Sequence, residues 1–316
     1  MLRGEYYLKD YMEKIGNFNV GYIDSVLSVE GYHDLFNFSA AELAHQSSVV
    51  SRREIASRLN KNMRTYDFVF IPNSGFLNSN LPLMKNCELK LSFDRLNSEL
   101  SLLKTGEVTN NCMGTPLAIK DCVAITEYIT SEYLENYFMS IDTDPIPYYY
   151  QDCEIIVKNL PLEETSIRVD NIRGGNLPSY IFAAIIPSDN MIGSETVSST
   201  CFKQHNVSAF NITLNGNSVN GYPIDVTSSV YPFQKFMDVT NRYMNPYCGE
   251  GLKLGHFLYN WIYSHKFEAE SSPQGWIGMS IELKQPLLGP HNLVIWCVNE
   301  CGITIDKFHQ VEKINL

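Results

Sequence analysis

The sequence predicts an all-β protein in which two sandwiches follow one another, the first of them incomplete, with a few short helices in the loops. Three observations favour this fold class. Apolar and polar residues alternate in many short runs, a proline-rich stretch divides the chain at residues 142–147, and strands do not alternate with helices as in parallel α/β folds. With 316 residues, 44% of them hydrophobic, the chain is long enough for two cores.

The clearest strand pattern lies at the end of the chain, in residues 276–316. Apolar and polar residues alternate in 279–283, which predicts a strand with one buried face. Two prolines and a glycine in 285–292 predict a loop, and the apolar run 293–298 predicts a strand buried on both faces. Alternation resumes at 303–305. We therefore expect the chain to end in three strands.

The segment before the prolines contains the same kinds of element in smaller number. Prolines disfavour helix in the residue that precedes them, so the stretch 142–147 predicts a linker and a domain boundary. We expect an incomplete first sandwich in residues 1–140 and a complete second one in 141–316. The elements predicted before the linker are helices at 5–15, 51–60 and 131–139 and strands at 66–72, 87–93 and 123–130.

The segment after the linker predicts seven or eight short strands and one convincing helix, at 231–243. Asn215-Gly216 follows an alternating run and is a strong signal for a hairpin turn. Residues 252–263 fit a strand or a helix equally well. This order of elements favours a sandwich of the jelly-roll type. The predicted strands are 148–159, 166–172, 180–186, 208–214 and those of the closing stretch.

Composition argues against several classes of protein. The formal net charge is −11 and no basic run exceeds Arg52-Arg53, so we expect no direct binding of nucleic acid. No apolar signal segment or membrane span is visible, and the eight cysteines lack C-x-x-C pairs. We expect free thiols in a chain that is not secreted, and no glycan on the sequons at Asn37, Asn206 and Asn211.

No residue pattern identifies a catalytic, cofactor-binding or metal-binding site. The histidines do not occur at the spacings that bring two ligands to one metal ion. Cys297 and Cys301 would point the same way, about 13 Å apart, in an extended strand, although Asn299-Glu300 leaves room for a turn. The other candidates, which we interpret as structural or solvated residues, are His33, His45, His205, His256, His265, His291, His309, Gly174-Gly175, Gly249–Gly251, Asp142, Asp144, Glu163 and Glu164.

Several segments together resemble the double jelly-roll, hexon-like major capsid proteins of Polinton/Maverick elements and adintoviruses. The resemblance rests on pattern and order, from about Tyr66 onward, and not on one invariant motif. In the family the last strand ends on an acidic residue, a place taken here by Asp306. The segments that carry the resemblance are YYQDCEIIVKN at 149–159, 209–215 with its Asn-Gly turn, YPFQKFMDVTNRYM at 231–244, and the closing WIGMSIELKQPL, NLVIWCVNE and ITIDKFHQV.

This resemblance implies a structural virion protein and not an enzyme, with no cofactor. It implies self-association as a homotrimer of tandem sandwiches, contacts with penton and other capsid proteins, assembly inside the host cell and a final location in the virion. The nineteen tyrosines and sixteen phenylalanines suit broad interfaces. The family's first roll begins with strands ahead of the helix that 5–15 resembles. We therefore expect a truncated or genome-integrated copy.

Two other functions fit the same fold class. One is a carbohydrate- or ligand-binding jelly roll, and the other is a minor, penton-type capsid protein. A metal-dependent enzyme of the cupin kind is disfavoured by the histidine spacing. If strands are missing from the first roll, Leu89, Leu91 and Phe93 should lose their cover, and a chain that begins near Asp142 should behave better than the full one.

Overall fold

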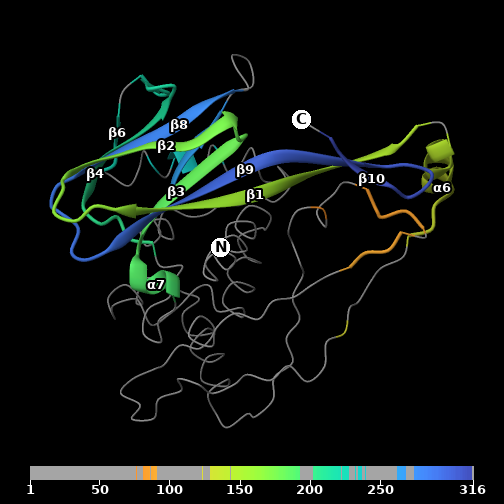
Figure 1. The fold of residues 1–316 in the computed structure, drawn as a ribbon, viewed down its shortest axis with the longest axis horizontal. Coiled ribbons are helices and arrows are strands. Elements are labelled where there is room, and N and C mark those ends of the chain that lie inside the picture. Colours follow the sequence, from red (N-terminus) through yellow and green to blue (C-terminus); the bar gives the residue numbers. More distant parts are fainter. Residues whose placement is uncertain are drawn as a thin grey trace, which may run out of the picture.

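The computed structural model describes residues 76, 81–85, 87–90, 123, 129–142, 144–192, 202–221, 223–227, 232, 234–236, 239, 262–267 and 274–314. Figure 1 shows them as a β-sandwich from which two long strands extend toward a short helix. Within these residues no helix is long and apolar enough to cross a lipid bilayer.

The described elements are mostly strands. The two α-helices are short, and the strands range from two to fifteen residues. In chain order the elements are α6 (Glu132–Met139), η3 (Ser140–Asp142), β1 (Ile146–Leu160), β2 (Ser166–Asn176), β3 (Tyr180–Pro187), α7 (Ser188–Ile192), β4 (Val207–Leu214), β5 (Asn217–Ser218), β6 (Ile224–Asp225), β7 (Tyr263–Lys266), β8 (Gln274–Leu283), β9 (His291–Ile305) and β10 (Val311–Ile314).

The strands form two antiparallel sheets. The first sheet has the order β1-β9-β3-β7, with β10 also paired to β9, and the second has the order β2-β8-β4-β5, with β6 also paired to β4. From β1 to β4 and again from β6 to β9, each strand lies in the opposite sheet to the one before it. This order is that of a jelly roll, so the predicted all-β class and jelly-roll sandwich are confirmed for the described residues after 144.

Strand β9 is the centre of the core, and its residues 291–298 are buried on both faces. Trp296 lies in register between Ile155 of β1 and Phe182 of β3. Phe202 packs on Trp296 with ring centroids 5.7 Å apart, and Phe236 packs on Phe182 at 6.1 Å, so this outer face is covered. These contacts explain why 293–298 is a continuous apolar run, as predicted.

The opposite, inner face of the first sheet meets the second sheet. Ile295 of β9 lies in register with Ala183, which is opposite Tyr263 of β7. The Tyr263 ring stacks on Phe210 of β4, with centroids 4.4 Å apart and planes 11° apart. The buried residues of β8 that complete this layer are Ile277, Met279, Ile281 and Leu283, which follow the predicted alternation.

Two turns are fixed by asparagine and aspartate side chains. Asn215 and Gly216 have φ of 51° and 83°, values that a hairpin turn of the predicted Asn-Gly type requires. The Asn215 Oδ1 accepts a hydrogen bond from the Trp276 N–H at 3.0 Å. Asp306 Oδ1 likewise accepts from the N–H groups of Phe308 and Gln310, so the acidic residue at the end of β9 holds the turn to β10.

One strand prediction was wrong in its boundaries and another is only partly described. Residues 303–305 are not a separate strand, because β9 continues through Asn299-Glu300 and stays paired with β1 over its whole length. The third closing strand is β10. Residues 87–90 lie outside any strand and Leu89 is 48% exposed, while Leu91 and Phe93 lie outside the described residues.

The predicted helix at 131–139 is confirmed as α6, and helical backbone occurs at Pro232, 234–236 and Val239 within the predicted 231–243. The ambiguous stretch 252–263 ends where β7 begins. The predictions at 5–15, 51–60 and 66–72, and with them most of the first sandwich, lie outside the described residues. The division into domains at 140 stays a prediction.

Replacing Trp296 by alanine tests the central role of β9. We expect Trp296→Ala to lower the free energy of unfolding by about 3–5 kcal/mol, because it removes a fully buried ring and leaves a cavity. Leu288→Ala is the matched control: Leu288 is 95% exposed in the β8–β9 loop, and its loss should change stability by less than about 0.5 kcal/mol. Urea denaturation measures both, and equal effects would contradict this description of the core.

Candidate functional site

The residues singled out in the sequence do not come together as a catalytic or metal-binding site in the described region. No group of three histidine, cysteine, aspartate or glutamate side chains there could hold a metal ion. Asp144, Glu163 and Glu164 are exposed in loops. Gly174-Gly175 lies at the end of β2, whereas His33, His45, His256 and Gly249–Gly251 lie outside the described residues.

The described cysteines Cys87, Cys153, Cys297 and Cys301 are thiols and not disulfides. Cys297 and Cys301 both lie in β9, so the turn that could have joined them is not formed. Burial is the main influence on Cys297 and raises its pKa to about 11, against the opposing effect of Arg173. A thiol with so high a pKa is a poor nucleophile at neutral pH.

Arg173 reaches across the sandwich from the second sheet to the first. Its register partner Ile277 is buried between the sheets, and a bulge after Val169 places Arg173 opposite it. The Arg173 Nη1 lies 3.2 Å from Oε2 of Glu154 in β1, and the guanidinium also acts on the Cys297 thiol. Sequence reasoning missed this contact, which links the two edge strands β1 and β2.

A second contact that the sequence did not reveal joins two histidines at the end of the sandwich where the β8–β9 loop lies. The rings of His205 and His291 lie edge to face with centroids 4.7 Å apart. His291 Nδ1 bonds the Gly289 carbonyl at 2.8 Å. The pair spans 86 positions of sequence, so no spacing rule could have found it.

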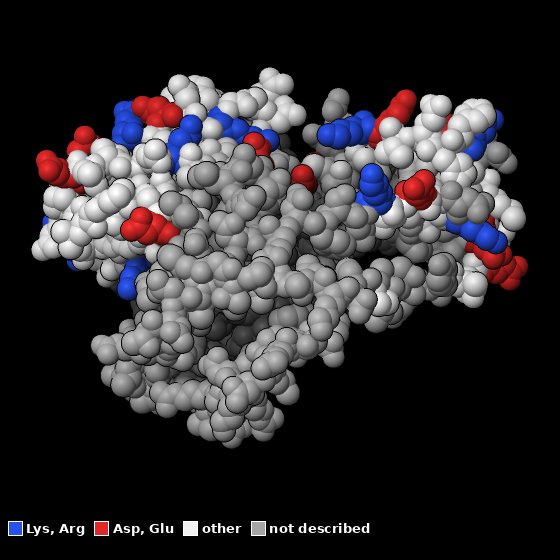
Figure 2. All heavy atoms as spheres, turned by 60° about the horizontal axis from the view of Figure 1, so that its bottom comes forward, with Lys and Arg blue, Asp and Glu red and all other residues white. Residues whose placement is uncertain are grey.

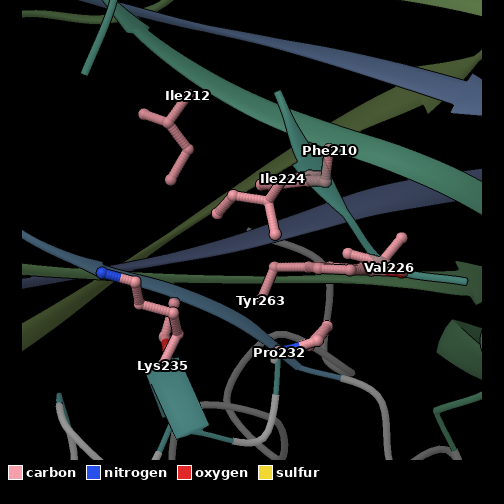
Figure 3. A pocket seen from close by; sticks show the side chains of 8 residues that line it. Phe210, Ile212, Ile224, Val226, Pro232, Lys235 and Tyr263 are labelled. Carbon is pink, nitrogen blue, oxygen red and sulfur yellow. The ribbon is translucent and has the colours of Figure 1, made fainter. Parts of the chain in front are cut away.

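A small cavity lies where β4, β6 and β7 meet Pro232 and Lys235 (Figure 3). It holds about 10 Å³, room for about one water molecule and not for a sugar or a cofactor. The predicted alternative of a ligand-binding jelly roll gains no support from it. The residues that line it are Phe210, Ile212, Ile224, Val226, Pro232, Lys235, Tyr263 and Ser264.

The charged side chains of the described surface are mixed in sign. Figure 2 shows lysines and arginines interspersed with aspartates and glutamates over both ends of the face in view. Close pairs contribute to this mixture, such as Arg168 and Asp170, whose Nε and Oδ1 lie 2.9 Å apart. Exposed pairs of this kind contribute little to stability.

One sequon asparagine is closed to modification in the folded chain. Asn211 is buried in β4, and its Oδ1 accepts a hydrogen bond from the Ser218 hydroxyl at 2.6 Å. Asn206 is exposed in the turn before β4, and Asn37 lies outside the described residues. The buried amide of Asn211 cannot receive a glycan without unfolding the edge of the second sheet.

The best candidate for a functional surface lies on the long strands β1 and β9. We call the part of this pair that extends past the sandwich, 146–152 of β1 with 299–305 of β9, the extended ribbon. Each strand has fifteen residues, about 50 Å, and the ribbon runs past the sandwich toward α6 and β10 (Figure 1). The register between β1 and β9 has no interruption. The face that meets the second sheet in the sandwich therefore continues along the ribbon, where no described strand of the second sheet covers it.

Residues from before the linker cover that face of the ribbon. Tyr148 is fully buried; its hydroxyl accepts a hydrogen bond from the Met84 N–H at 3.3 Å and donates one to the Pro82 carbonyl at 3.5 Å. The Phe76 ring lies 5.5 Å from that of Tyr148. The ribbon cluster consists of Met84, Ile146, Tyr148 and Ile305, with Phe76, Leu81, Leu83, Cys87, Tyr137, Phe138, Ile141 and Ile303 packed against them.

The ribbon cluster changes one expectation from the sequence. A chain that begins near Asp142 would lack residues 76–90 and α6, and it would expose Tyr148, Ile303 and Ile305 to water. We therefore expect the shorter chain to be less soluble than the full one. The sequence did not show this, because Met84 and Tyr148 are 64 positions apart.

Removing one hydroxyl tests the ribbon cluster. We expect Tyr148→Phe to cost about 1–2 kcal/mol of stability, because it leaves the Met84 N–H and the Pro82 carbonyl without this partner. Tyr149→Phe is the matched control, since the neighbouring ring points to the opposite face and is 50% exposed. Urea denaturation compares the two. Limited proteolysis should cut residues 76–90 faster in Tyr148→Phe than in Tyr149→Phe. Equal cleavage of the two variants would contradict the contact of Tyr148 with this segment.

The half-buried histidine of β7, His265, makes stability depend on pH. Burial, and secondly the charge of Lys235, lowers the pKa of His265 to about 4. The unfolded chain, in which histidine has a pKa of about 6.5, therefore takes up the proton first as the pH falls. The free energy of unfolding should fall between pH 6.5 and 4, by up to about 3 kcal/mol from this residue.

We expect His265→Phe to flatten that dependence, because phenylalanine keeps the ring contact with Phe267 and cannot be protonated. Thermal melting at pH 8, 6.5, 5.5 and 4.5 measures the slope for both proteins. The difference in melting temperature between wild type and variant at pH 8 is the control, because there His265 is uncharged in both the folded and the unfolded chain. Parallel slopes in wild type and variant would show that His265 does not contribute.

Comparison with known proteins finds likeness at the level of structure alone. No protein-family model matches the chain, and no curated protein sequence matches it. A chain of the Sputnik virophage is 14% identical over 54% of this chain and 39% of its own length, with a TM-score of 0.32. A chain of the PBCV-1 virus capsid is 11% identical over 58% and 55%, with a TM-score of 0.36.

PBCV-1 VP54, fitted into a reconstruction of the Sputnik virophage, is 10% identical over 59% of this chain and 55% of its own length, with a TM-score of 0.36. This chain thus matches only about half, or less, of the length of these three capsid and virophage chains. The likeness therefore covers only part of each chain.

Proposed function

We propose that this chain is a structural virion protein, a hexon-like major capsid subunit that builds a shell by association and carries out no reaction. The observation that supports the proposal most directly is where the resembling segments lie in the fold. Residues 149–159 lie in β1, 209–214 in β4, and most of 276–306 in β8 and β9, strands that belong to both sheets of the jelly roll. The proposal rests on this correspondence and not on the partial likeness to the capsid chains.

The close packing of the sandwich suits a subunit of a rigid shell. Its central strand is buried on both faces over residues 291–298, and the two sheets are linked across one edge by Arg173 and Glu154. The cavity where β4, β6 and β7 meet has room for about one water molecule. Such an interior favours rigidity over binding of a small molecule.

The extended ribbon suits a tandem arrangement of two rolls. It carries an apolar face beyond its own sandwich, and residues from before the linker pack on that face. We propose that this is the contact through which the first roll, in 1–140, is held beside the second, in 141–316. Polinton, Maverick or adintovirus ancestry, a homotrimer, penton and other capsid proteins as partners, and a location in the virion belong to the same proposal.

Association in solution tests the proposal. We expect the full 316-residue chain to elute as a trimer, with a mass of three times 36.0 kDa, about 108 kDa, by size exclusion with light scattering. Negative-stain images should show particles with pseudo-hexagonal outlines. Trp296→Ala, which weakens the fold, is the control and should lose the trimer as it unfolds.

A chain that stays monomeric at tens of micromolar while melting cooperatively would contradict the capsid function. Specific retention on a glycan array by that monomer would instead favour the ligand-binding alternative. A trimer with no glycan retention would support the proposal as stated.

A further inference from the structure

The His205–His291 contact lies where three connections of the sandwich meet. Asn206 precedes β4, and its carbonyl accepts a hydrogen bond from the Lys284 N–H at the start of the β8–β9 loop at 2.9 Å. The Thr165 carbonyl of the β1–β2 turn accepts from the Leu283 N–H at 2.7 Å. His291 is the first residue of β9 and lies opposite Leu160, the last of β1. The two rings thus join the turn at 203–206 to the end of the first sheet.

The turn that carries His205 has two successive residues in the left-handed region of backbone conformation. His205 and Asn206 have φ of 52° and 61°, in the left-handed region. Residues other than glycine adopt this region at a cost, of order 1–3 kcal/mol where surrounding structure must enforce it. Packing of the His205 ring on His291 is one of the contacts that enforce it here.

The polar surroundings of His205 do not favour a positive charge. Its Nε2 is buried and has no hydrogen-bond partner. Burial, then the charges of His291 and Lys203, lower its pKa to about 4, and a hydrogen bond with the Ile185 backbone acts in the opposite direction. Protonation at this position would therefore add a charge that burial and both neighbouring groups oppose.

Carboxylates do occur on the neighbouring elements, but on their exposed sides. Glu163 and Glu164 lie in the β1–β2 turn, Asp189 in α7, Asp225 in β6 and Glu282 in β8, with side chains toward water. Lys284 is exposed as well, and Lys158 of β1 is half-buried. Exposed charges are screened by water and salt, so the carboxylates compensate little for charge between the sheets.

We propose that the His205–His291 contact is an acid-sensitive latch, which holds the turn at 203–206 against the start of β9 at neutral pH and releases it when His205 takes up a proton. The latch is local: the centres of β4, β8 and β9 stay paired while the loops at this end open. It does not depend on the proposed function, because it follows from the packing of this end of the sandwich.

The size of the effect follows from linkage. In the opened turn a histidine has its ordinary pKa of about 6.5, and in the closed turn that of His205 is about 4. On going from pH 7.5 to pH 5.0, the equilibrium between open and closed turn should shift toward opening by about 30-fold.

Amide hydrogen exchange on the full-length protein at pH 7.5 and 5.0, corrected for intrinsic exchange rates, tests the latch. We expect peptides that cover 202–207 and 284–291 to lose protection by about 30-fold, while those that cover 276–281 keep it. His205→Phe keeps an aromatic ring at the contact and removes the titrating group, so the loss should vanish in this variant. His265→Phe, which alters another half-buried histidine, is the matched control and should keep the local response.

An unchanged acid response in His205→Phe, or a wild-type loss of protection spread evenly over all strands, would overturn the proposal. His291→Phe provides the same test from the partner ring if His205→Phe fails to fold. Exchange of the histidine ring C2 hydrogen in the wild type gives a direct check, with a transition for His205 expected well below pH 6 and one near 6.5 counting against the latch.

Discussion

The structure depends on the position of β9 between β1 and β3. Over 291–298 the strand has a neighbour on each edge and a covered layer on each face, so eight consecutive residues are almost fully removed from water. From 299 to 305 the same strand continues into the ribbon and pairs with β1 and β10. One uninterrupted strand thus belongs to both the sandwich core and the ribbon cluster. A change that weakens it affects both.

Much of the second sandwich could be predicted because its signals are local. Alternation at 279–283, the apolar run at 293–298 and the Asn-Gly turn each depend on a few neighbouring residues, and each is where the sequence places it. The continuity of β9 was missed for a physical reason. Glu300 is exposed on the outer face, which is no longer covered there, and Asn299 is half-buried; two polar residues in succession look in a sequence like the end of a strand.

The candidate sites could not be predicted because they are made of distant residues. Arg173 lies opposite Ile277, within reach of Glu154 and Cys297, because a bulge in β2 shifts its pairing with β8 by two positions, and bulges have no reliable sequence signal. The His205–His291 and Tyr148–Met84 contacts join positions 86 and 64 apart. Spacing rules apply to ligands that are near one another in sequence, so they do not detect pairs of this kind.

The unbroken register of β1 with β9 also determines how the molecule responds to mechanical force. Hydrogen bonds between antiparallel strands lie perpendicular to the strand axis. A force that pulls β1 and β9 past each other along their axes loads all fifteen of their paired positions together in shear, and they must fail at once. A pull on the C-terminus instead opens β10, whose four paired positions separate in succession. The protein is therefore stiff along the ribbon and yields first at its last strand.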